Sequence, residues 1–164
     1  MVTIAKKPHR YQLTLVWEGN RGTGTSDYAA YGRQYRVSIA GKPDLVGSAD
    51  PMFRGDPALP NPEDLLVTAL SSCHMLSYLA LCARGRIRVV SYVDAAEGTL
   101  EFRPDGGGSF REVVLHPKVT VAAGTDVARA LELHHPAGEQ CFIASSCNFP
   151  VRHEPVVELE AVGS

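Results

Sequence analysis

The residues of this chain best suited to carry chemistry are its four cysteines, and the surroundings of two of them are distinctive. Cys73 lies in the middle of a long apolar stretch, between Ser72 and His74. Cys141 comes soon after Gly138, and if it opens a short helix, the helix N-terminus favours its thiolate and lowers its pKa. The thiolate is the nucleophilic and oxidisable form of cysteine. These two positions are therefore candidates for redox chemistry, with packing as a small buried residue as the alternative for Cys73.

The remaining cysteines and the histidines suggest other interpretations, which the spacing disfavours. Cys82 and Cys147 are expected to be small core residues. His134 and His135, at the end of a predicted helix, are expected to contact solvent and the helix dipole. Hydrolysis by a Ser-His-Asp triad is disfavoured because no Gly-x-Ser-x-Gly motif occurs. A metal site is disfavoured because no Cys-x-x-Cys pair or paired histidine spacing is present. Its potential ligands would be Cys73, His74, His134, His135, Cys141, Cys147 and His153.

The element that must position Cys73 is a predicted helix from Asn61 to Arg84. Asn61 can cap its start, Pro62 fits the first helical position, and Glu63 suits the positive end of the helix dipole. No further glycine or proline occurs before Gly85, where the helix is expected to end. Apolar residues cover nearly its whole circumference, which is typical of a buried helix.

Strands are predicted on both sides of this helix, at residues 11–17, 35–39, 45–46, 87–93, 99–102, 113–121 and 155–160. The first three strands are expected to form an antiparallel meander. A predicted turn at residues 94–98 indicates a second meander after the helix. Pro117 suggests an edge strand or a bulge. A shorter helix is expected to start at Thr125 and Asp126 and to end at Pro136 and Gly138, followed by one or two helical turns within 139–147. This layout predicts an α+β fold in a single domain, residues 1–164.

The composition of the chain limits the kinds of partner that it is expected to bind. The chain has 164 residues, of which 45% are hydrophobic and 21% charged, and its net charge is −2. The absence of a basic block argues against nucleic acid. No apolar run approaches the ~20 residues of a membrane span, and the N-terminus lacks the apolar stretch of a signal peptide. We therefore expect no membrane association and a cytoplasmic location, where thiols stay reduced. A helix apolar on all sides needs more cover than one sheet and one short helix supply, which predicts a homodimer.

Three motifs in combination resemble a known family. They are Asn61-Pro-Glu-Asp-Leu-Leu66, Ser71-Ser-Cys-His-Met75 and Cys141-Phe-Ile-Ala-Ser-Ser146. Together they resemble the OsmC/Ohr family, the osmotically inducible protein C and organic hydroperoxide resistance proteins, from about Trp17 to Val151. The segments Gly41-Lys-Pro43 and Gly47-Ser-Ala-Asp-Pro51 resemble an OsmC-like subgroup. The resemblance implies the OsmC-like fold, with antiparallel sheets around a buried central helix in an intertwined homodimer.

The resemblance also implies a set of site residues. Cys73 matches the peroxidatic cysteine and Cys141 the resolving cysteine. Glu63 matches the glutamate that holds an arginine beside the reactive thiol. Arg54, in the loop before the helix, matches that arginine in one branch of the family, and Arg33 resembles the arginine of the other branch. Both are candidates, with Arg54 preferred.

The implied activity is a thiol-dependent peroxidase, an antioxidant enzyme of the oxidative stress response. Its substrates would be organic hydroperoxides, with hydrogen peroxide as a further candidate. Cys73 would become a sulfenic acid, a redox-active Cys73–Cys141 disulfide would follow, and an external dithiol would reduce it. No cofactor or metal is required. His74, Cys82 and Cys147 depart from the family pattern and leave the substrate open. The alternative is a dimeric protein that binds a small molecule or lipid, with redox-inert cysteines.

Overall fold

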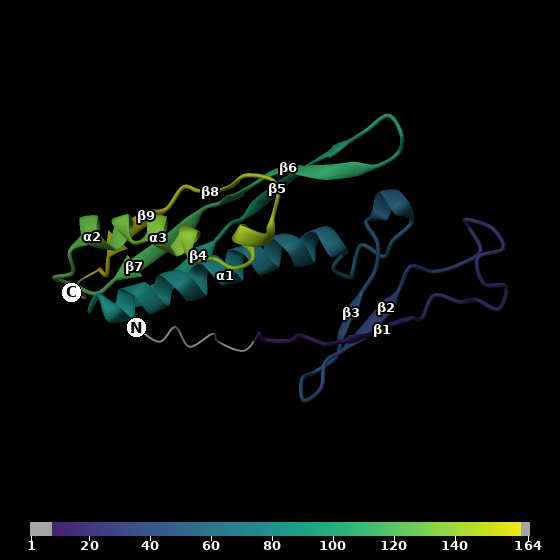
Figure 1. Cartoon of the computed structure of the whole chain (residues 1–164), viewed down its shortest axis with the longest axis horizontal. Helices are drawn as coiled ribbons and strands as arrows, with labels where there is room; N and C mark the ends of the chain where they lie inside the picture. Colours follow the sequence, from purple (N-terminus) through teal and green to yellow (C-terminus); the bar gives the residue numbers. More distant parts are fainter. Residues whose placement is uncertain (1–7, 162–164) are drawn as a thin grey trace. The chain divides into compact units, whose positions relative to one another are not determined.

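The computed structural model describes residues 8–161, and the chain separates into two compact units, one up to Pro62 and one from Glu63 onward (Figure 1). Each unit contains strands of its own. The first holds both candidate arginines and the second holds all four cysteines.

The first unit is built on a small antiparallel sheet of strands β1 (Thr14–Trp17), β2 (Tyr35–Ser38) and β3 (Leu45–Gly47). The strands lie in the order β1-β2-β3, which confirms the predicted meander. A single 3-10 turn, η1 (Pro51–Phe53), follows in the loop that leads to the central helix.

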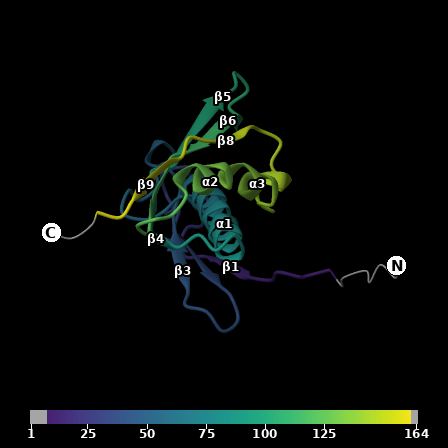
Figure 2. The same cartoon turned by 90° about the vertical axis from the view of Figure 1, so that its left-hand side faces the viewer.

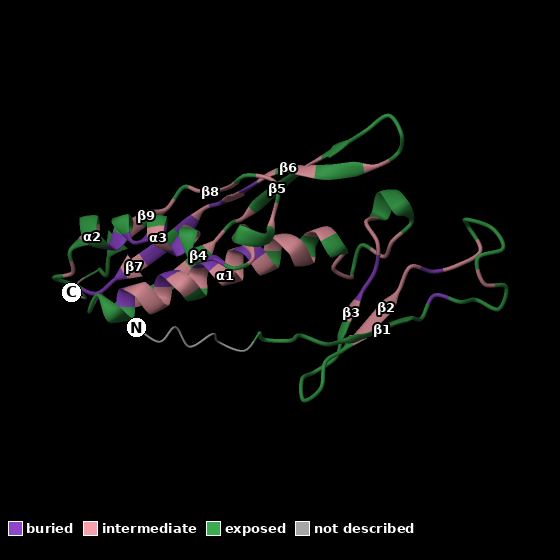
Figure 3. Cartoon of the chain, in the orientation of Figure 1, coloured by how far each residue is buried: buried purple, intermediate pink, exposed green. Residues whose placement is uncertain are grey.

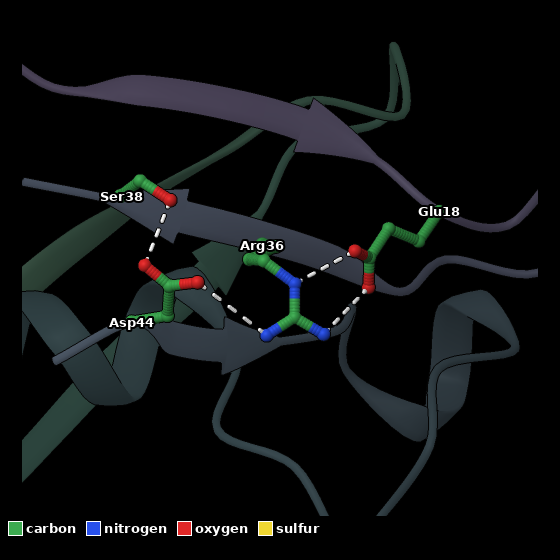
Figure 4. Close-up of polar contacts among 4 residues, drawn as sticks. All are labelled: Glu18, Arg36, Ser38 and Asp44. Atoms are coloured by element: carbon green, nitrogen blue, oxygen red, sulfur yellow. Dashed lines mark hydrogen bonds and ion pairs between the residues drawn. The ribbon is translucent and has the colours of Figure 1, made fainter.

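An arginine in the middle strand ties this sheet together through polar contacts (Figure 4). Arg36 Nε donates a hydrogen bond to Glu18 Oε1 at 2.8 Å, and Arg36 Nη1 lies 3.7 Å from Asp44 Oδ2. Ser38 Oγ donates to Asp44 Oδ1 at 2.8 Å. The contacts join β2 to residues that flank its two neighbouring strands, which supports the observed strand register.

The predicted central helix is present as α1 (Pro62–Arg84). Glu63 and Asp64 occupy its first turn, as the dipole favours. It ends at Arg84, directly before Gly85 as predicted, but Arg86 with φ 58°, and not Gly85, adopts the left-handed conformation. The Arg86 N–H donates to the Ala83 carbonyl and the Ile87 N–H to the Cys82 carbonyl, at 3.2 and 2.9 Å. These two bonds form a Schellman closure, and Ile87 is buried beneath it.

Helix α1 is buried along one stripe only within this chain (Figure 3). The buried residues recur at every fourth position, and they are Leu70, His74, Tyr78 and Cys82. The other faces are half-buried or exposed, and Leu76 is 63% exposed. By length and a mean hydropathy of 1.7 the helix meets the criteria for a membrane span. That is weak evidence, because the core helix of a globular protein meets them too.

The four strands that follow α1 form one long, interrupted hairpin. β4 pairs antiparallel with β7, and β5 pairs antiparallel with β6. The predicted turn at residues 94–98 is therefore wrong, because the chain runs on from β4 into β5 and reverses only after β5. The strands are β4 (Val89–Asp94), β5 (Glu97–Phe102), β6 (Gly108–Leu115) and β7 (Pro117–Val121).

The interruption of this hairpin has a polar cause. The Asp94 carboxylate accepts the backbone N–H of His116 at 2.7 Å and the Ser71 hydroxyl at 2.5 Å. Asp94 thus satisfies the strand backbone where the ladder breaks and links it to α1. The turn signal around Asp94 marks this break instead of a reversal. Pro117 begins β7 at the same break.

Two short C-terminal strands complete the sheets. β8 (Val151–His153) pairs parallel with β6, and β9 (Val156–Leu159) pairs parallel with β7. The sheets of this unit are therefore mixed, where antiparallel sheets were expected. Pro117 lies in a central strand, since β7 lies between β4 and β9, so the edge interpretation is wrong. Pro117 is the first residue of β7, a position where a strand tolerates proline, and the register shift of the β4–β7 pair lies between Val89 and Ser91.

Two short helices and a 3-10 turn cover α1 on the side of the sheets (Figures 1 and 2). α2 (Val127–Glu132) starts as predicted, with Asp126 accepting the Arg129 N–H at 3.0 Å. α3 (His134–Glu139) contains the proline and glycine that were expected to end the helix. Pro136 is tolerated because it lies in the first turn, where no N–H is needed. The turn η2 (Ala144–Ser146) follows.

Candidate redox site

The structure brings Cys73 and Cys141 together. Cys73 is half-buried in the middle of α1, and Cys141 is buried with 1% of its surface exposed, two residues after the end of α3. Their side chains lie close enough for the Cys73 thiol to raise the pKa of the Cys141 thiol, and both thiols are free. Two residues far apart in the sequence therefore lie close enough for chemistry between their sulfur atoms.

The electrostatics of Cys141 correct the sequence prediction. Burial raises the pKa of its thiol to about 11, and the interaction with the Cys73 side chain acts in the same direction. The Ala144 N–H donates to Sγ at 3.4 Å and opposes this shift. The predicted effect of a backbone N–H group is thus present, but the desolvation of Cys141 outweighs it. Cys141 is protonated at neutral pH, which makes it a poor first nucleophile.

Cys73 lies in an open groove with a volume of about 630 Å³. Most of the groove wall is apolar, so it suits the alkyl part of a small organic molecule. The lining residues come from α1 and from the segment around Cys141, and they are Ala69, Ser72, Cys73, Leu76, Ser77, Ala80, Arg84, Gln140, Phe142 and Ile143.

The predicted activating glutamate is Glu63, half-buried in the first turn of α1. It belongs to the same unit as the cysteines. The arginine that it is expected to hold belongs to the first unit, whether it is Arg54 or Arg33. The contact of either arginine with Glu63 or Cys73 therefore stays a prediction.

The two arginines differ in how they are held within the first unit. Arg33 donates hydrogen bonds to the carbonyl oxygens of Tyr31 and Tyr28. Its guanidinium also lies over both rings, with Cζ 4.0 and 4.4 Å from their centroids. Arg54 is exposed, has φ 64°, and its Cζ lies 5.9 Å from the centroid of Tyr28. Arg33 already has a structural role in the hairpin, and Arg54 is the less constrained of the two.

The two extra cysteines are packing residues, as predicted. Cys82 is buried in the core beside Tyr78, and its burial raises the pKa of the thiol. Cys147 is half-buried against the second core cluster, where Sγ donates to the Ile143 carbonyl at 3.3 Å. Burial raises the pKa of Cys147 as well.

Sequence reasoning missed a cluster of three histidines, of which two are buried and one is half-buried. His74 Nε2 lies 3.0 Å from His134 Nδ1, and the His74 ring stacks on His153 with centroids 5.1 Å apart. His134 is 1% exposed and stacks on Tyr78, so its predicted exposure to solvent is wrong; His135 is exposed, as predicted. Burial lowers the pKa of all three, to about 4 for His74 and about 3 for His134. They come from three separate elements, so no local spacing could have revealed them.

Within residues 8–161, no group of three or more His, Cys, Asp or Glu side chains is arranged to hold a metal ion. The histidine cluster stacks its rings and pairs nitrogen with nitrogen, which does not direct several lone pairs at one point.

Comparison with known proteins identifies the family. The model of the OsmC-like protein family matches residues 55–156 of this chain. The chain belongs to this family. An OsmC-like protein of unknown function from Vibrio cholerae is 32% identical, with a TM-score of 0.81, and the match covers 91% of this chain and 100% of that one. No curated protein sequence matches the chain.

Solved structures of lower identity share the OsmC-like fold. An organic hydroperoxide resistance protein from Elizabethkingia anophelis is 16% identical with a TM-score of 0.67, over 94% of this chain and 99% of that one. The organic hydroperoxide resistance protein OhrB of Bacillus subtilis is 18% identical with a TM-score of 0.60, over 90% and 98%. These matches confirm the predicted α+β, OsmC-like fold.

Proposed function

We propose that this OsmC-like protein is a thiol-dependent peroxidase that reduces organic hydroperoxides. The observation that carries the proposal is the Cys73–Cys141 thiol pair, with Cys73 in an apolar groove and Cys141 buried behind it. Such a pair supports oxidation of one thiol and capture of the oxidised product by the other. The names of the related organic hydroperoxide resistance proteins agree with this chemistry.

The first step is attack of the Cys73 thiolate on the distal peroxide oxygen. A sulfur–oxygen bond forms, the oxygen–oxygen bond breaks, and the alkoxide takes up a proton to leave as an alcohol. An ordinary thiol has a pKa of about 8.5 and needs a nearby cation to be a thiolate at neutral pH. Arg54, or alternatively Arg33, supplies that cation, and Glu63 orients its guanidinium.

The second step is attack of Cys141 sulfur on the Cys73 sulfenic acid. The disulfide forms, the sulfur–oxygen bond breaks, and the hydroxide combines with the Cys141 proton to give water. An external dithiol then reduces the disulfide by exchange. The cytoplasm, where dithiols are kept reduced, suits this cycle, and a homodimer is expected to cover the open face of α1.

The proposal is tested by mapping the thiols before and after one equivalent of cumene hydroperoxide. We expect two thiols to be lost, and peptide mass analysis to join Cys73 to Cys141. Cys82 and Cys147 are internal controls, because their buried or packed sulfur atoms should stay free. Four free thiols after the challenge would contradict the proposal. That result would favour the alternative, in which the groove binds a small molecule or lipid and the cysteines are inert.

A further inference from the structure

A second cavity lies against the resolving cysteine. Its volume is about 260 Å³, which is room for several water molecules. Cys141 lines this cavity, whereas Cys73 lines the groove. Three histidines and a carboxylate also line the cavity, and they are His74, His135, His153 and Glu139. Polar groups of this kind are the ones that hold water next to a thiol.

The second step of the proposed reaction has a proton to move. Cys141 is buried and protonated at neutral pH, yet only its thiolate attacks a sulfenic acid efficiently. A base that accepts the proton during the attack removes this obstacle. Cys141 shares its cavity with His74, His135 and His153, so these histidines are the candidate bases.

We propose that His153 accepts the Cys141 thiol proton through water in this cavity as Cys141 attacks the oxidised Cys73, and returns it to the departing hydroxide. The sulfur–sulfur bond forms, the sulfur–oxygen bond of Cys73 breaks, and water is the product. The inference rests on the proposed peroxidase function and assigns a residue to its second step.

Burial distinguishes His153 from its neighbours. His74 is 2% and His134 1% exposed, so a positive charge on either would lie in the core. His153 is half-buried in the short strand β8, where a charge can be hydrated through the cavity. Burial also lowers its pKa, so the ring is neutral and able to accept a proton at pH 7. His135 is exposed and pairs with Glu139 at 3.5 Å.

The backbone of α3 accommodates the His153 ring. A methyl group added at Gly138 would come within 3.3 Å of His153 Cε1 and 3.5 Å of Nδ1. The absence of a side chain at Gly138 therefore lets the ring lie close to the chain three residues before Cys141. On its other side His153 stacks against His74.

The charged and titratable groups around this site come from α1, α3 and the neighbouring strands. α1 contributes His74, whose pKa is lowered by burial and by His153 and raised by the charge of Asp94 on β4. α3 contributes His134, His135 and Glu139, and the repulsion from His135 lowers the pKa of His153. Arg152 and Glu154 flank His153 and pair with Glu112 and His116.

The first test uses the wild-type full-length chain. The reduced protein is mixed rapidly with cumene hydroperoxide, quenched at set times, and the conversion of sulfenic acid to disulfide is followed by intact mass across a range of pH. We expect a rate constant that is flat from about pH 7 to about pH 9 and falls at acidic pH as the base is protonated, as general-base catalysis requires. A rate that rises about tenfold per pH unit over the whole range, as an unassisted thiol gives, would overturn the inference.

The second test is H153Q with H135Q as the matched control from the same cavity. At pH 7 we expect H153Q to form the disulfide about 100-fold more slowly, with a rate that now rises tenfold per pH unit and approaches wild type at high pH. H135Q should keep the flat profile. A uniform loss at all pH values would mean a packing role for His153, and a sloping profile in H135Q alone would move the base to His135; either result overturns the inference. If the wild-type protein forms no disulfide, the proposed function fails and the inference fails with it.

Discussion

Two faces of helix α1 that both carry apolar residues have different surroundings. One face is the buried stripe of Leu70, His74, Tyr78 and Cys82, which the sheets and α3 cover. The other is the open face, lined by Ala69, Cys73, Leu76 and Ala80, which borders the groove. Each face carries one cysteine, so the comparison shows how burial alone changes the properties of the thiol.

The difference shows what makes a thiol in this helix available. Cys82 is sealed in the core, where it is 1% exposed and burial raises its pKa. Cys73 is half-buried, contacts a second thiol and borders a groove large enough for a substrate. The proposed chemistry therefore lies on the open face of α1, and the buried core contacts lie on the sealed face.

Replacement of each of these two cysteines by serine is expected to give the largest effects. C73S should lower hydroperoxide turnover by at least about 1,000-fold, since the nucleophile itself is lost. C82S should keep the turnover and lower the free energy of unfolding by about 1 to 2 kcal/mol, because a hydroxyl replaces a thiol in the core. Turnover is measured by loss of cumene hydroperoxide and stability by urea denaturation. Residual turnover in C73S near the wild-type rate would move the nucleophile elsewhere.

A leucine on each face gives the next largest expected effect. L70A should lower the free energy of unfolding by about 2 to 5 kcal/mol, as expected for a core leucine. L76E should instead convert the proposed homodimer to a monomer, because it places a carboxylate in an apolar interface. Sedimentation or light scattering measures the mass of each variant. A wild-type protein that is monomeric at micromolar concentration would remove the dimer from the account.

Acid should destabilise the folded protein through His74, which lies on the sealed face of α1. The pKa of His74 is about 4 in the folded protein, below its usual value of 6.5, because the buried ring favours the neutral form. The unfolded chain therefore binds the proton first, and stability is complete above about pH 6.5 and is lost as pH falls toward 4. The loss should be on the order of 3 kcal/mol.

The matched variants for this prediction are H74Q and H9Q. H74Q should flatten the dependence of the free energy of unfolding on pH between about 7 and 4, whereas H9Q, at an exposed position of the first unit, should leave it unchanged. An equal slope in H74Q and wild type would show that the acid sensitivity lies in other groups.

The smallest effect concerns the cation that the open face needs. E63Q should slow sulfenic acid formation about tenfold by loosening the arginine, and D64N, one residue further in the same turn, should not. R54K and R33K then identify the arginine, because lysine keeps the charge but loses the bidentate contact. The variant with the slower first step marks the residue. If neither is slower, the Glu–Arg activation is wrong.

The start and length of α1, the first meander and the packing roles of Cys82 and Cys147 could all be predicted from the sequence. They depend on local signals, namely a proline and acidic first turn, alternating strands and the usual burial of cysteine. The pairing of β4 with β7 and of β5 with β6 could not be predicted. Asp94 stabilises a break between β4 and β5 through contacts with Ser71 and His116, which are distant in sequence.

The sequence by itself determined the chemical groups of the site and the helix that carries Cys73, because both follow from residue type and short-range spacing. Only the tertiary structure decided which stripe of that helix is sealed, that the pKa of Cys141 rises instead of falling, and that His74, His134 and His153 meet. The burial of each residue, and the pKa shift that burial causes, depend on what packs against that residue from elsewhere in the chain.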